Sequence, residues 1–312
     1  MAQENPPKAL AWLRAARLQF YPMVVVLYAV GAAMGGLRAG AVDWTAAVLG
    51  WLCLFFIELA TVLTNEHFDY ESDRVNRNAG PFTGGSRVLV DGLLTFREVR
   101  AGIAAALAAL AVAAALLLAH LSAGARAVVG GWLALGVVLG LGYTAPPLRL
   151  SYRGLGELDV AFTHSAYVVV AGFAAQAGQW RDALPWMVSL PAFFAVLTAN
   201  TLAGIPDHAA DASVDKRSCS VLFGRAAAAG IAAVTALAAA AAGVWLWADG
   251  VVRGRVGFVF LATAVHALAL CWVLVSYIRS GSPDRRLDGA MVNALNFIIW
   301  FGLIPLVYFV SH

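Results

Sequence analysis

The sequence predicts an all-α fold: a polytopic membrane bundle of about nine transmembrane helices, arranged as two four-helix repeats around a central cavity plus one extra helix. Apolar residues make up 61% of the 312 positions and charged residues 12%, whereas a soluble domain is about half apolar and about a quarter charged. Nine stretches are also long and apolar enough to cross a bilayer. Because these stretches occupy nearly the whole chain, we treat residues 1–312 as a single membrane domain.

Each predicted span has about 20 mostly apolar residues, the length that a membrane-crossing helix needs. Several spans are rich in Ala and Gly, which lets helices approach closely where lipid provides no hydrophobic drive for association. The nine spans are 20–37, 44–64, 99–120, 126–142, 157–178, 184–204, 223–248, 256–277 and 289–310. Residues 1–19 carry four charged side chains and lead into further spans, so we interpret them as a cytoplasmic lead-in rather than a cleaved signal.

The basic residues predict the orientation. With the N-terminus in the cytoplasm, the inside segments hold 16 of the 21 Lys and Arg residues, including Arg285 and Arg286, and the outside segments hold the other 5. Cytoplasmic loops of membrane proteins carry such an excess. We therefore expect an integral protein of a bacterial inner membrane, with the N-terminus and the long loops cytoplasmic and the C-terminus outside. The net charge of +3 is too small to imply nucleic acid.

The cytoplasmic segment 65–98 begins with Asn65, Asp69 and Asp73, spaced four residues apart. On a helix, residues with this spacing lie on one face. Stacked carboxylates repel each other, so the arrangement favours a cation between them. Mg²⁺ prefers oxygen ligands and is typically shared by one or two carboxylates and a substrate phosphate. The spacing therefore predicts a magnesium site.

A second segment with the same spacing, residues 205–222, follows the sixth span. The matched residues are Glu58, Asn65, Asp69 and Asp73 in the first copy and Asn200, Asp207, Asp211 and Asp215 in the second. Four spans separate the copies, so both lie on the same side of the membrane and indicate a parallel internal repeat. One such run is usually solvated surface, but two matched runs favour function.

Two residues of these motifs have open interpretations. Acidic residues at membrane depth are costly, so Glu58 is either a pocket residue or the partner of a nearby cation. Pro206 is a candidate helix break between Asn200 and the aspartates that follow.

Basic side chains on the predicted cytoplasmic side are candidates for binding a phosphate group. Arginine offers phosphate a planar fork and lysine a point charge. Together with the amide side chain of Asn200, these basic residues are the candidate substrate-binding residues: Arg17, Arg74, Arg87, Arg149, Arg153, Asn200, Lys216 and Arg217. The alternative for each basic residue is a topology signal or a lipid headgroup contact. That alternative is weaker for Arg74, Arg87 and Lys216, which lie within or just past the Asp motifs.

Two loop segments adjoin the motifs. The glycine-rich run 80–87 either presents backbone N–H groups to a phosphate or forms a plain flexible turn. Two successive prolines stop the fourth span and leave Tyr143 and Arg149 near the same cavity.

The histidines and cysteines do not predict a further metal site. His67 and His208 lie within the motifs, but the Cys and His residues have no zinc-ligand spacing. We interpret the other histidines as packing or interface residues and the three cysteines as inert thiols.

At these residues the chain resembles the UbiA superfamily of intramembrane prenyltransferases. The resemblance rests on the Asn65–Asp73 motif, the Asp207–Arg217 motif, the Tyr143–Arg149 segment, Gly154–Glu157 and the nine-span layout. It implies two Mg²⁺ ions, an isoprenyl diphosphate donor, a lateral opening to lipid for the prenyl tail, and an aromatic or other lipophilic acceptor.

The resemblance also implies roles for individual residues. The catalytic set is Asn65, Asp69, Asp73, Asp207, Asp211 and Tyr143, and the metal ligands are Asp69, Asp73, Asp207, Asp211 and Asp215. The chain departs from the commonest patterns at Glu66, where many relatives have Asp, and at the Arg that follows the Tyr motif. Gly154–Glu157 resembles the menaquinone-pathway branch more than the ubiquinone and heme branches.

The expected chemistry is ionisation of the donor, with charge developing on the leaving diphosphate and an allylic cation held by aromatic faces. Candidate aromatic residues are Phe68, Tyr70, Tyr143, Tyr152 and Phe162, with ordinary packing as the alternative for each. A prenyltransferase in quinone or related lipid synthesis is the main hypothesis. A UbiA-type terpene cyclase needs the same Asp motifs and stays an alternative. A transporter is disfavoured because transporters often have inverted repeats around a midplane site.

Overall fold

The computed structural model describes residues 7–80, 82–281 and 287–312. Within these ranges it contains helices and no named strand. Pro81 of the glycine-rich run, Arg285, Arg286 and the first six residues of the lead-in lie outside the described residues. In chain order the elements are α1 (Lys8–Ala16), η1 (Leu18–Phe20), α2 (Tyr21–Ala39), α3 (Trp44–Phe68), α4 (Tyr70–Val75), α5 (Phe96–His120), α6 (Ala123–Gly142), η2 (Leu150–Tyr152), α7 (Gly156–Thr163), α8 (Ala166–Ala177), α9 (Ala183–Ser213), α10 (Cys219–Phe223), α11 (Arg225–Ala248), α12 (Gly254–Phe258), α13 (Phe260–Ser280) and α14 (Asp288–Val310).

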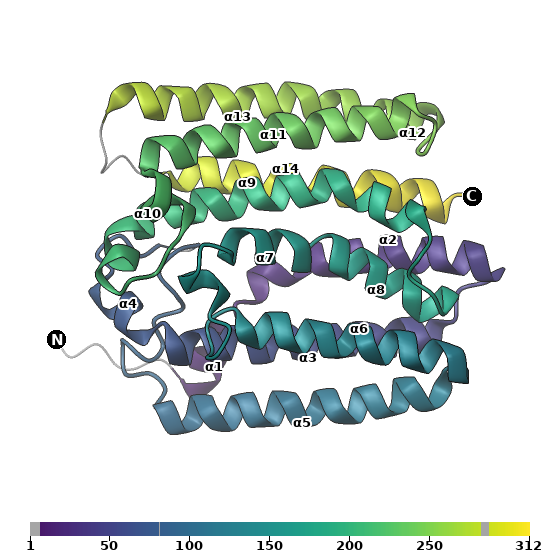
Figure 1. Cartoon of the computed structure of the whole chain (residues 1–312), viewed down its shortest axis with the longest axis horizontal. Coiled ribbons are helices and arrows are strands. Elements are labelled where there is room, and N and C mark those ends of the chain that lie inside the picture. The colour runs from purple at the N-terminus through teal and green to yellow at the C-terminus, as the bar shows by residue number, and fades with distance from the viewer. Residues whose placement is uncertain (1–6, 81, 282–286) are drawn as a thin grey trace.

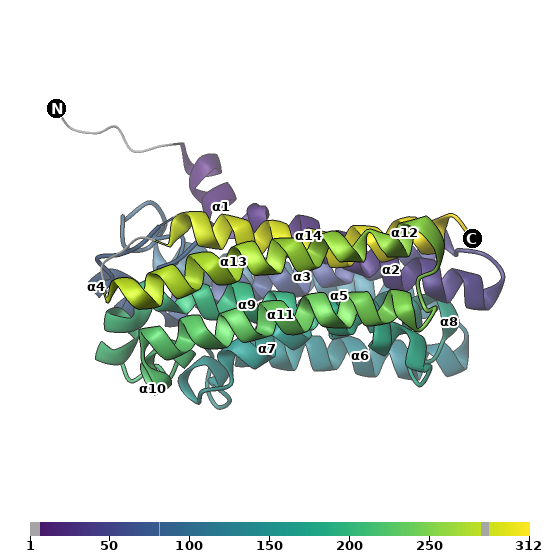
Figure 2. The ribbon, with the colours of Figure 1, turned by 90° about the horizontal axis from the view of Figure 1, so that it is seen from above.

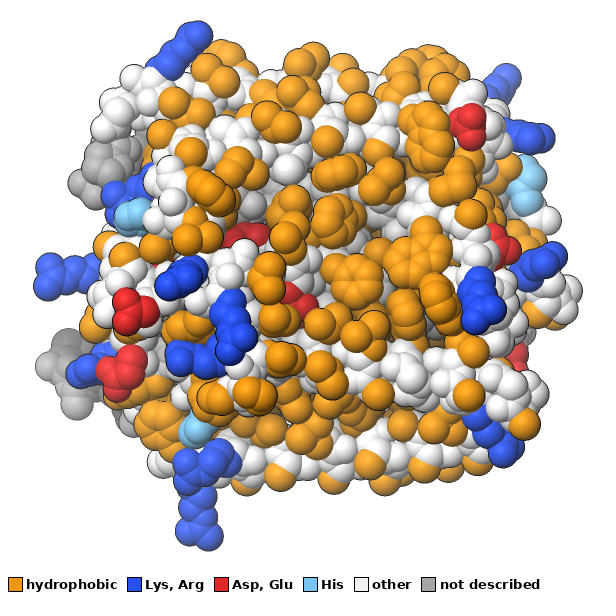
Figure 3. All heavy atoms as spheres, viewed as in Figure 1, with side chains coloured by type: hydrophobic (Ala, Val, Ile, Leu, Met, Phe, Trp, Pro, Cys, Tyr) orange, Lys and Arg blue, Asp and Glu red, His pale blue; other side chains and the backbone are white. Residues whose placement is uncertain are grey.

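The long helices run side by side along one direction (Figure 1). Nine segments of the described chain are long and apolar enough to cross a membrane, which confirms the predicted fold class. Hydrophobic side chains cover the middle of the bundle, and charged side chains gather toward its two ends (Figure 3). Large apolar side chains in the middle of a span point outward, and Trp272 is 73% exposed. This surface is that of a protein whose solvent is lipid. The internal repeat stays a prediction.

Small residues let two spans meet closely. α2 packs along α8, and a Cβ added to Gly31 of α2 or to Gly172 of α8 would overlap backbone atoms of the facing helix. Close backbone approach of this kind drives helix association in lipid.

The fifth predicted span is two helices rather than one. α7 ends at Thr163, α8 begins at Ala166, and the backbone between them is a turn at His164 and Ser165. Thr163 Oγ1 donates to the carbonyl of Asp159, and Ser165 Oγ donates to the carbonyl of Ala161. Such back-bonding to the preceding turn competes with the helix ladder, and the break turns His164 toward the bundle interior.

The sixth helix is longer than expected, because residues 205–213, predicted to lie in a loop, continue α9 through Pro206. Proline lacks the N–H of a helical hydrogen bond, but the first polar segment supports the helix here. Asn78 Nδ2 donates to the carbonyl of Pro206 (3.3 Å), and Asn76 Nδ2 donates to Asp207 Oδ1 (2.7 Å).

The lead-in forms α1, which lies beside α5 and the loop before it. Lys8 Nζ pairs with Glu98 (2.7 Å), and an Arg14 nitrogen pairs with Asp91 (3.0 Å). α1 ends at Arg17, whose backbone is left-handed (φ 50°). α4 and α10 lie at the same end of the bundle as α1, and the C-terminus lies at the opposite end (Figures 1 and 2).

Candidate active site

A cavity of about 1060 Å³ opens within the half of the bundle that carries the Asp motifs. Its polar lining includes Asn65, Asp69 and Asp73 of the first motif and Asp207 and Asp211 of the second. The structure therefore brings the two segments together, although they are more than a hundred residues apart in sequence.

The first motif does not lie on one continuous helix. Asp69 caps α3, and Asp73 lies in the separate short helix α4. Asp69 Oδ1 accepts from the Tyr152 hydroxyl (3.0 Å), and Asn65 Oδ1 accepts from Thr144 Oγ1 (2.9 Å). The residues around the motif therefore fix its oxygen atoms.

Lys216 joins the two motifs. Its Nζ lies 3.1 Å from Asp69 Oδ2 and 3.9 Å from Asp211 Oδ1, and its side chain is 14% exposed. Asp207 is held separately, because Oδ1 accepts from Asn76 Nδ2 (2.7 Å) and Oδ2 accepts from the backbone N–H of Gly84 (3.2 Å). The ammonium group thus partly neutralises one carboxylate of each motif.

The glycine-rich segment closes over the first motif. Gly85 has φ +72°, and a Cβ there would overlap the carboxyl group of Asp73, so only glycine fits without a shift. Arg87 donates to the Asp73 carbonyl (2.8 Å). Ser86 donates its backbone N–H to Glu66 Oε1 (2.8 Å), and an Arg17 nitrogen donates to the same oxygen (2.5 Å).

Crowding of acidic groups shapes the electrostatics. Burial raises the pKa of Asp73 to about 7, and the nearby Asp69 and Glu66 add to the rise. Burial acts to lower the pKa of Lys216, but Asp69 and Asp211 outweigh it and hold that pKa well above its usual value. Burial and the adjacent Asp69 raise the pKa of Tyr152 to about 12. This crowding disfavours full ionisation of the acidic cluster and favours a cation beside it.

The carboxylates of the two motifs offer oxygen ligands on two sides of Lys216, but they do not form a complete coordination shell for a metal ion. No three acidic, His or Cys side chains of the described chain converge on one point as a metal site would require. Asp69 and Asp73 on one side, with Asp207 and Asp211 on the other, suit ions that take one or two carboxylates and complete their shell with water and phosphate oxygens.

Of the other predicted site residues, Arg17, Arg87, Tyr143 and Asn200 also line the cavity. Five do not, and all five are exposed: Arg74, Arg149, Arg153, Asp215 and Arg217.

These outward residues have local explanations. An Arg74 nitrogen pairs with Glu71 (2.7 Å), the Arg149 guanidinium stacks over the Tyr152 ring (3.8 Å), and Arg153 donates to a loop carbonyl. Asp215 follows the end of α9 and has a positive φ of 59°. The four-residue spacing places Asp215 on the motif face only if the helix continues, and α9 ends at Ser213.

Among the five candidate aromatic residues, only Tyr143 lines the cavity. Phe68 is 41% exposed and Tyr70 packs edge-on against Phe96. The aromatic lining instead includes Phe20, Phe82 and Tyr167.

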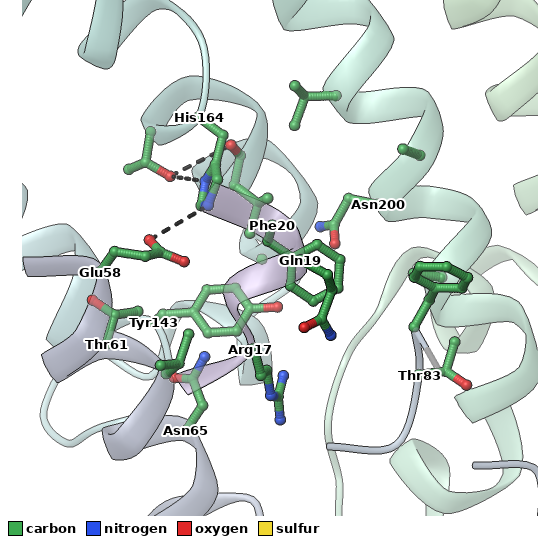
Figure 4. Close-up of a pocket in the computed structure, with 18 of the residues that line it drawn as sticks. Arg17, Gln19, Phe20, Glu58, Thr61, Asn65, Thr83, Tyr143, His164 and Asn200 are labelled. Atoms are coloured by element: carbon green, nitrogen blue, oxygen red, sulfur yellow. Dashed lines mark hydrogen bonds and ion pairs between the residues drawn. The ribbon is translucent and has the colours of Figure 1, made fainter. Parts of the chain in front are cut away.

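Sequence reasoning missed several lining residues. His164, interpreted as a packing or interface residue, faces Glu58 across the cavity, with Nε2 and Oε2 3.5 Å apart (Figure 4). Asp159 and Glu157 of α7 also line it. Glu66 is 2% exposed and does not line the cavity; the sequence singled it out only as a departure from the family pattern. Glu58 proves to be a pocket residue that also has a partner.

One wall of the cavity is apolar and borders the protein surface. Met23 and Val26 of α2 and Leu295, Ile299 and Leu303 of α14, two helices that pack against each other, line this wall. Ile299 and Leu303 are also 37% and 44% exposed, so the apolar lining continues onto the lipid-facing surface.

The model of the UbiA prenyltransferase family matches residues 23–302, and no curated protein matches the chain. A UbiA homolog from Aeropyrum pernix K1 in its apo form has a TM-score of 0.64 at 21% identity, over 91% of this chain and 97% of that one. A UbiA homolog from Archaeoglobus fulgidus bound to DMAPP and Mg²⁺ has a TM-score of 0.63 at 19% identity, over 94% and 98%. A digeranylgeranylglyceryl phosphate synthase has a TM-score of 0.62 at 13% identity, over 98% and 99%. At such identities the structures show the shared fold, and together with the family match they establish that this chain belongs to the UbiA prenyltransferase family.

Proposed function

We propose that the protein transfers a prenyl group from an isoprenyl diphosphate to an aromatic or other lipophilic acceptor, with Mg²⁺ as cofactor, in the synthesis of a quinone or related lipid. One observation carries the proposal: a single cavity joins two acidic motifs and Lys216 to an apolar wall between α2 and α14. That shape suits an amphiphile with a charged head and a long hydrocarbon tail. The Archaeoglobus homolog, bound in separate structures to DMAPP and to GPP with Mg²⁺, supports this donor class.

The residues present fit the proposed metal ions. Asp69, Asp73, Asp207 and Asp211 would hold them, while Asp215 points elsewhere. Burial among like charges disfavours the ionised form of Asp73, and a bound cation removes that penalty. Mg²⁺ would supply a positive charge that stabilises the leaving diphosphate.

The side chains around the motifs have distinct tasks. Lys216, Arg17 and Arg87 line the head-group end and hold the diphosphate in place as its negative charge grows. The bond between C1 and the bridging oxygen breaks, and its electron pair leaves with the diphosphate. An acceptor atom then bonds to C1 and loses its proton. Phe20 and Tyr143 beside the cavity favour the allylic cation and exclude water.

The apolar wall gives the donor an entry route. Because α2 and α14 present apolar side chains both to the cavity and to the surface, the tail of the donor enters sideways from lipid. The acidic motifs then face the cytoplasm of a bacterial inner membrane, where soluble enzymes supply prenyl diphosphates. The whole chain acts as one membrane domain.

The test is a product assay with purified protein, Mg²⁺ and prenyl diphosphates of graded length, with and without aromatic acceptors. A transferase gives a prenylated acceptor and releases diphosphate. Cyclised products formed without any acceptor would favour a terpene cyclase instead. Failure to consume any donor in the presence of Mg²⁺ would contradict the proposal.

A further inference from the structure

A second polar cluster lies deeper in the same cavity, away from the Asp motifs. Glu58 is seven residues before Asn65 on α3, which places it about 10 Å further into the bundle at the helical rise of about 1.5 Å per residue. Its carboxylate faces His164 at 3.5 Å, and both side chains line the cavity (Figure 4). The diphosphate subsite does not require this pair.

Asp159 adds an unsatisfied group to the cluster. It lines the cavity, is 9% exposed, and its Oδ1 has no hydrogen-bond partner. A buried carboxylate oxygen without a donor is costly, so a ligand with a hydrogen-bond donor would lower the energy of this site. His164 Nδ1 lies 3.1 Å from Thr163 Oγ1, which leaves the Nε2 side of the ring for Glu58 and a ligand.

The charge of this cluster selects its ligand. With Glu58 and Asp159 ionised, its net charge is negative whether or not His164 carries a proton. The Arg and Lys side chains along the described lining are Arg14, Arg17, Arg87 and Lys216. Each pairs with an acid near the head-group end. The charge of Arg17 also reaches Glu58, but Glu66 already balances it. A carboxylate-bearing acceptor would therefore meet uncompensated negative charge, and a neutral hydrogen-bond donor would not.

We propose that Glu58, His164 and Asp159 form the acceptor subsite, that it takes a neutral phenol or aromatic diol, and that the Glu58–His164 pair accepts the hydroxyl proton. This inference rests on the proposed function. Once the C1–O electron pair has left with the diphosphate, the ring carbon beside the oxygen bonds to C1 as the hydroxyl proton moves to the pair. The resulting dienone loses its ring proton to water and regains the hydroxyl proton from the pair. One proton is released per turnover.

The experiment compares a naphthalenediol with the dihydroxynaphthoate that has the same two hydroxyl groups and one added carboxylate. Product formation and diphosphate release are followed with the best isoprenyl diphosphate and saturating Mg²⁺. We expect the wild-type kcat/KM to favour the neutral diol by at least about tenfold, the size of effect that one unfavourable charge placement produces.

Variants then separate this subsite from the donor subsite. Glu58→Gln and His164→Gln should each lower diol prenylation by about 100-fold, a typical contribution of a general base, while the KM for the donor changes by less than about threefold. Glu58→Gln should also reduce the preference for the diol over the carboxylate-bearing acceptor. Glu58→Asp should retain part of the activity that Glu58→Gln loses. His266→Gln is the matched control, because His266 also lies in a spanning helix and bonds a polar side chain (Asn293, 2.8 Å) outside the cavity.

Each outcome is decisive. A wild-type preference for the carboxylate-bearing acceptor, or wild-type diol turnover by both Glu58→Gln and His164→Gln, would overturn the subsite. Donor consumption without prenylation of any neutral phenol would overturn it too. No donor consumption at all would instead contradict the proposed function. Elution of each variant as a monodisperse species in detergent, with donor KM retained, excludes misfolding as the cause of lost transfer.

Discussion

Lys216→Met removes a positive charge that pairs with one carboxylate of each motif. Nζ lies 3.1 Å from Asp69 and 3.9 Å from Asp211. At an effective dielectric constant of about 20, the attractions amount to about 5 and about 4 kcal/mol before the cost of burying the ammonium is subtracted. Removing one partner of a buried ion pair costs about 3–5 kcal/mol, because the remaining charges lose their compensation.

We therefore expect metal-free Lys216→Met to lose about 3–5 kcal/mol of stability and to regain part of it when Mg²⁺ binds the same carboxylates. The assay is thermal unfolding in detergent at a fixed heating rate, with chelator and then with excess Mg²⁺. The Mg²⁺-dependent rise in Tm should be larger in the variant than in the wild type. Arg217→Met is the matched control, since Arg217 is the exposed neighbour and its loss should change stability by less than about 0.5 kcal/mol.

Equal Tm values for Lys216→Met and wild type in chelator would refute this reasoning, since they would mean that the ammonium does not compensate the carboxylates. If Mg²⁺ raised the Tm of Lys216→Met and of the wild type by the same amount, the metal and the Lys216 ammonium group would not share the same carboxylates.

Three further predictions concern the metal site and the orientation. Asp69→Ala and Asp207→Ala should each nearly abolish turnover in a folded protein; activity within about threefold of wild type, under 1 kcal/mol of barrier, would exclude a metal role. Burial raises the pKa of Asp73 to about 7. Between the ordinary pKa of an aspartate and pH 7, the folded protein therefore keeps a proton on Asp73 that the unfolded chain has lost. The contribution of Asp73 to stability falls as pH rises through this range. Mg²⁺ must displace that proton, so the half-activating Mg²⁺ concentration should fall as pH rises through about 7, and Asp73→Asn should flatten the profile. In a cysteine-free background, an impermeant thiol reagent outside intact cells should label a cysteine at Ser311 and spare one at Arg77, both exposed positions; labelling at 77 alone would invert the topology.

Features set by local sequence were predictable. The spans follow from apolar length, and the convergence of Asp69 and Asp207 follows from matched spacing after two spans with the same orientation. Asp73 lines the cavity as the spacing predicted although α4 is a separate helix, because its N–H still donates to the Asp69 carbonyl (2.9 Å) and so keeps the helical spacing across the break.

Features set by chain reversals and long-range contacts were not predictable. Asp215 leaves the motif face because α9 ends at Ser213 and the chain turns with a positive φ, which no spacing reveals. His164 enters the cavity only because the fifth span breaks there. The role of Glu66 depends on the loop that brings Ser86 within 2.8 Å, twenty residues later in the chain.

In the proposed mechanism, metal bound by the two Asp motifs enables the donor to lose its diphosphate. Single-turnover release of diphosphate from an isoprenyl diphosphate, measured while Mg²⁺ is titrated into chelator-treated protein, tests it most directly. We expect no release in excess chelator, saturable release as Mg²⁺ is restored, and no recovery in Asp207→Ala at the same concentrations. Full release in excess chelator would contradict it.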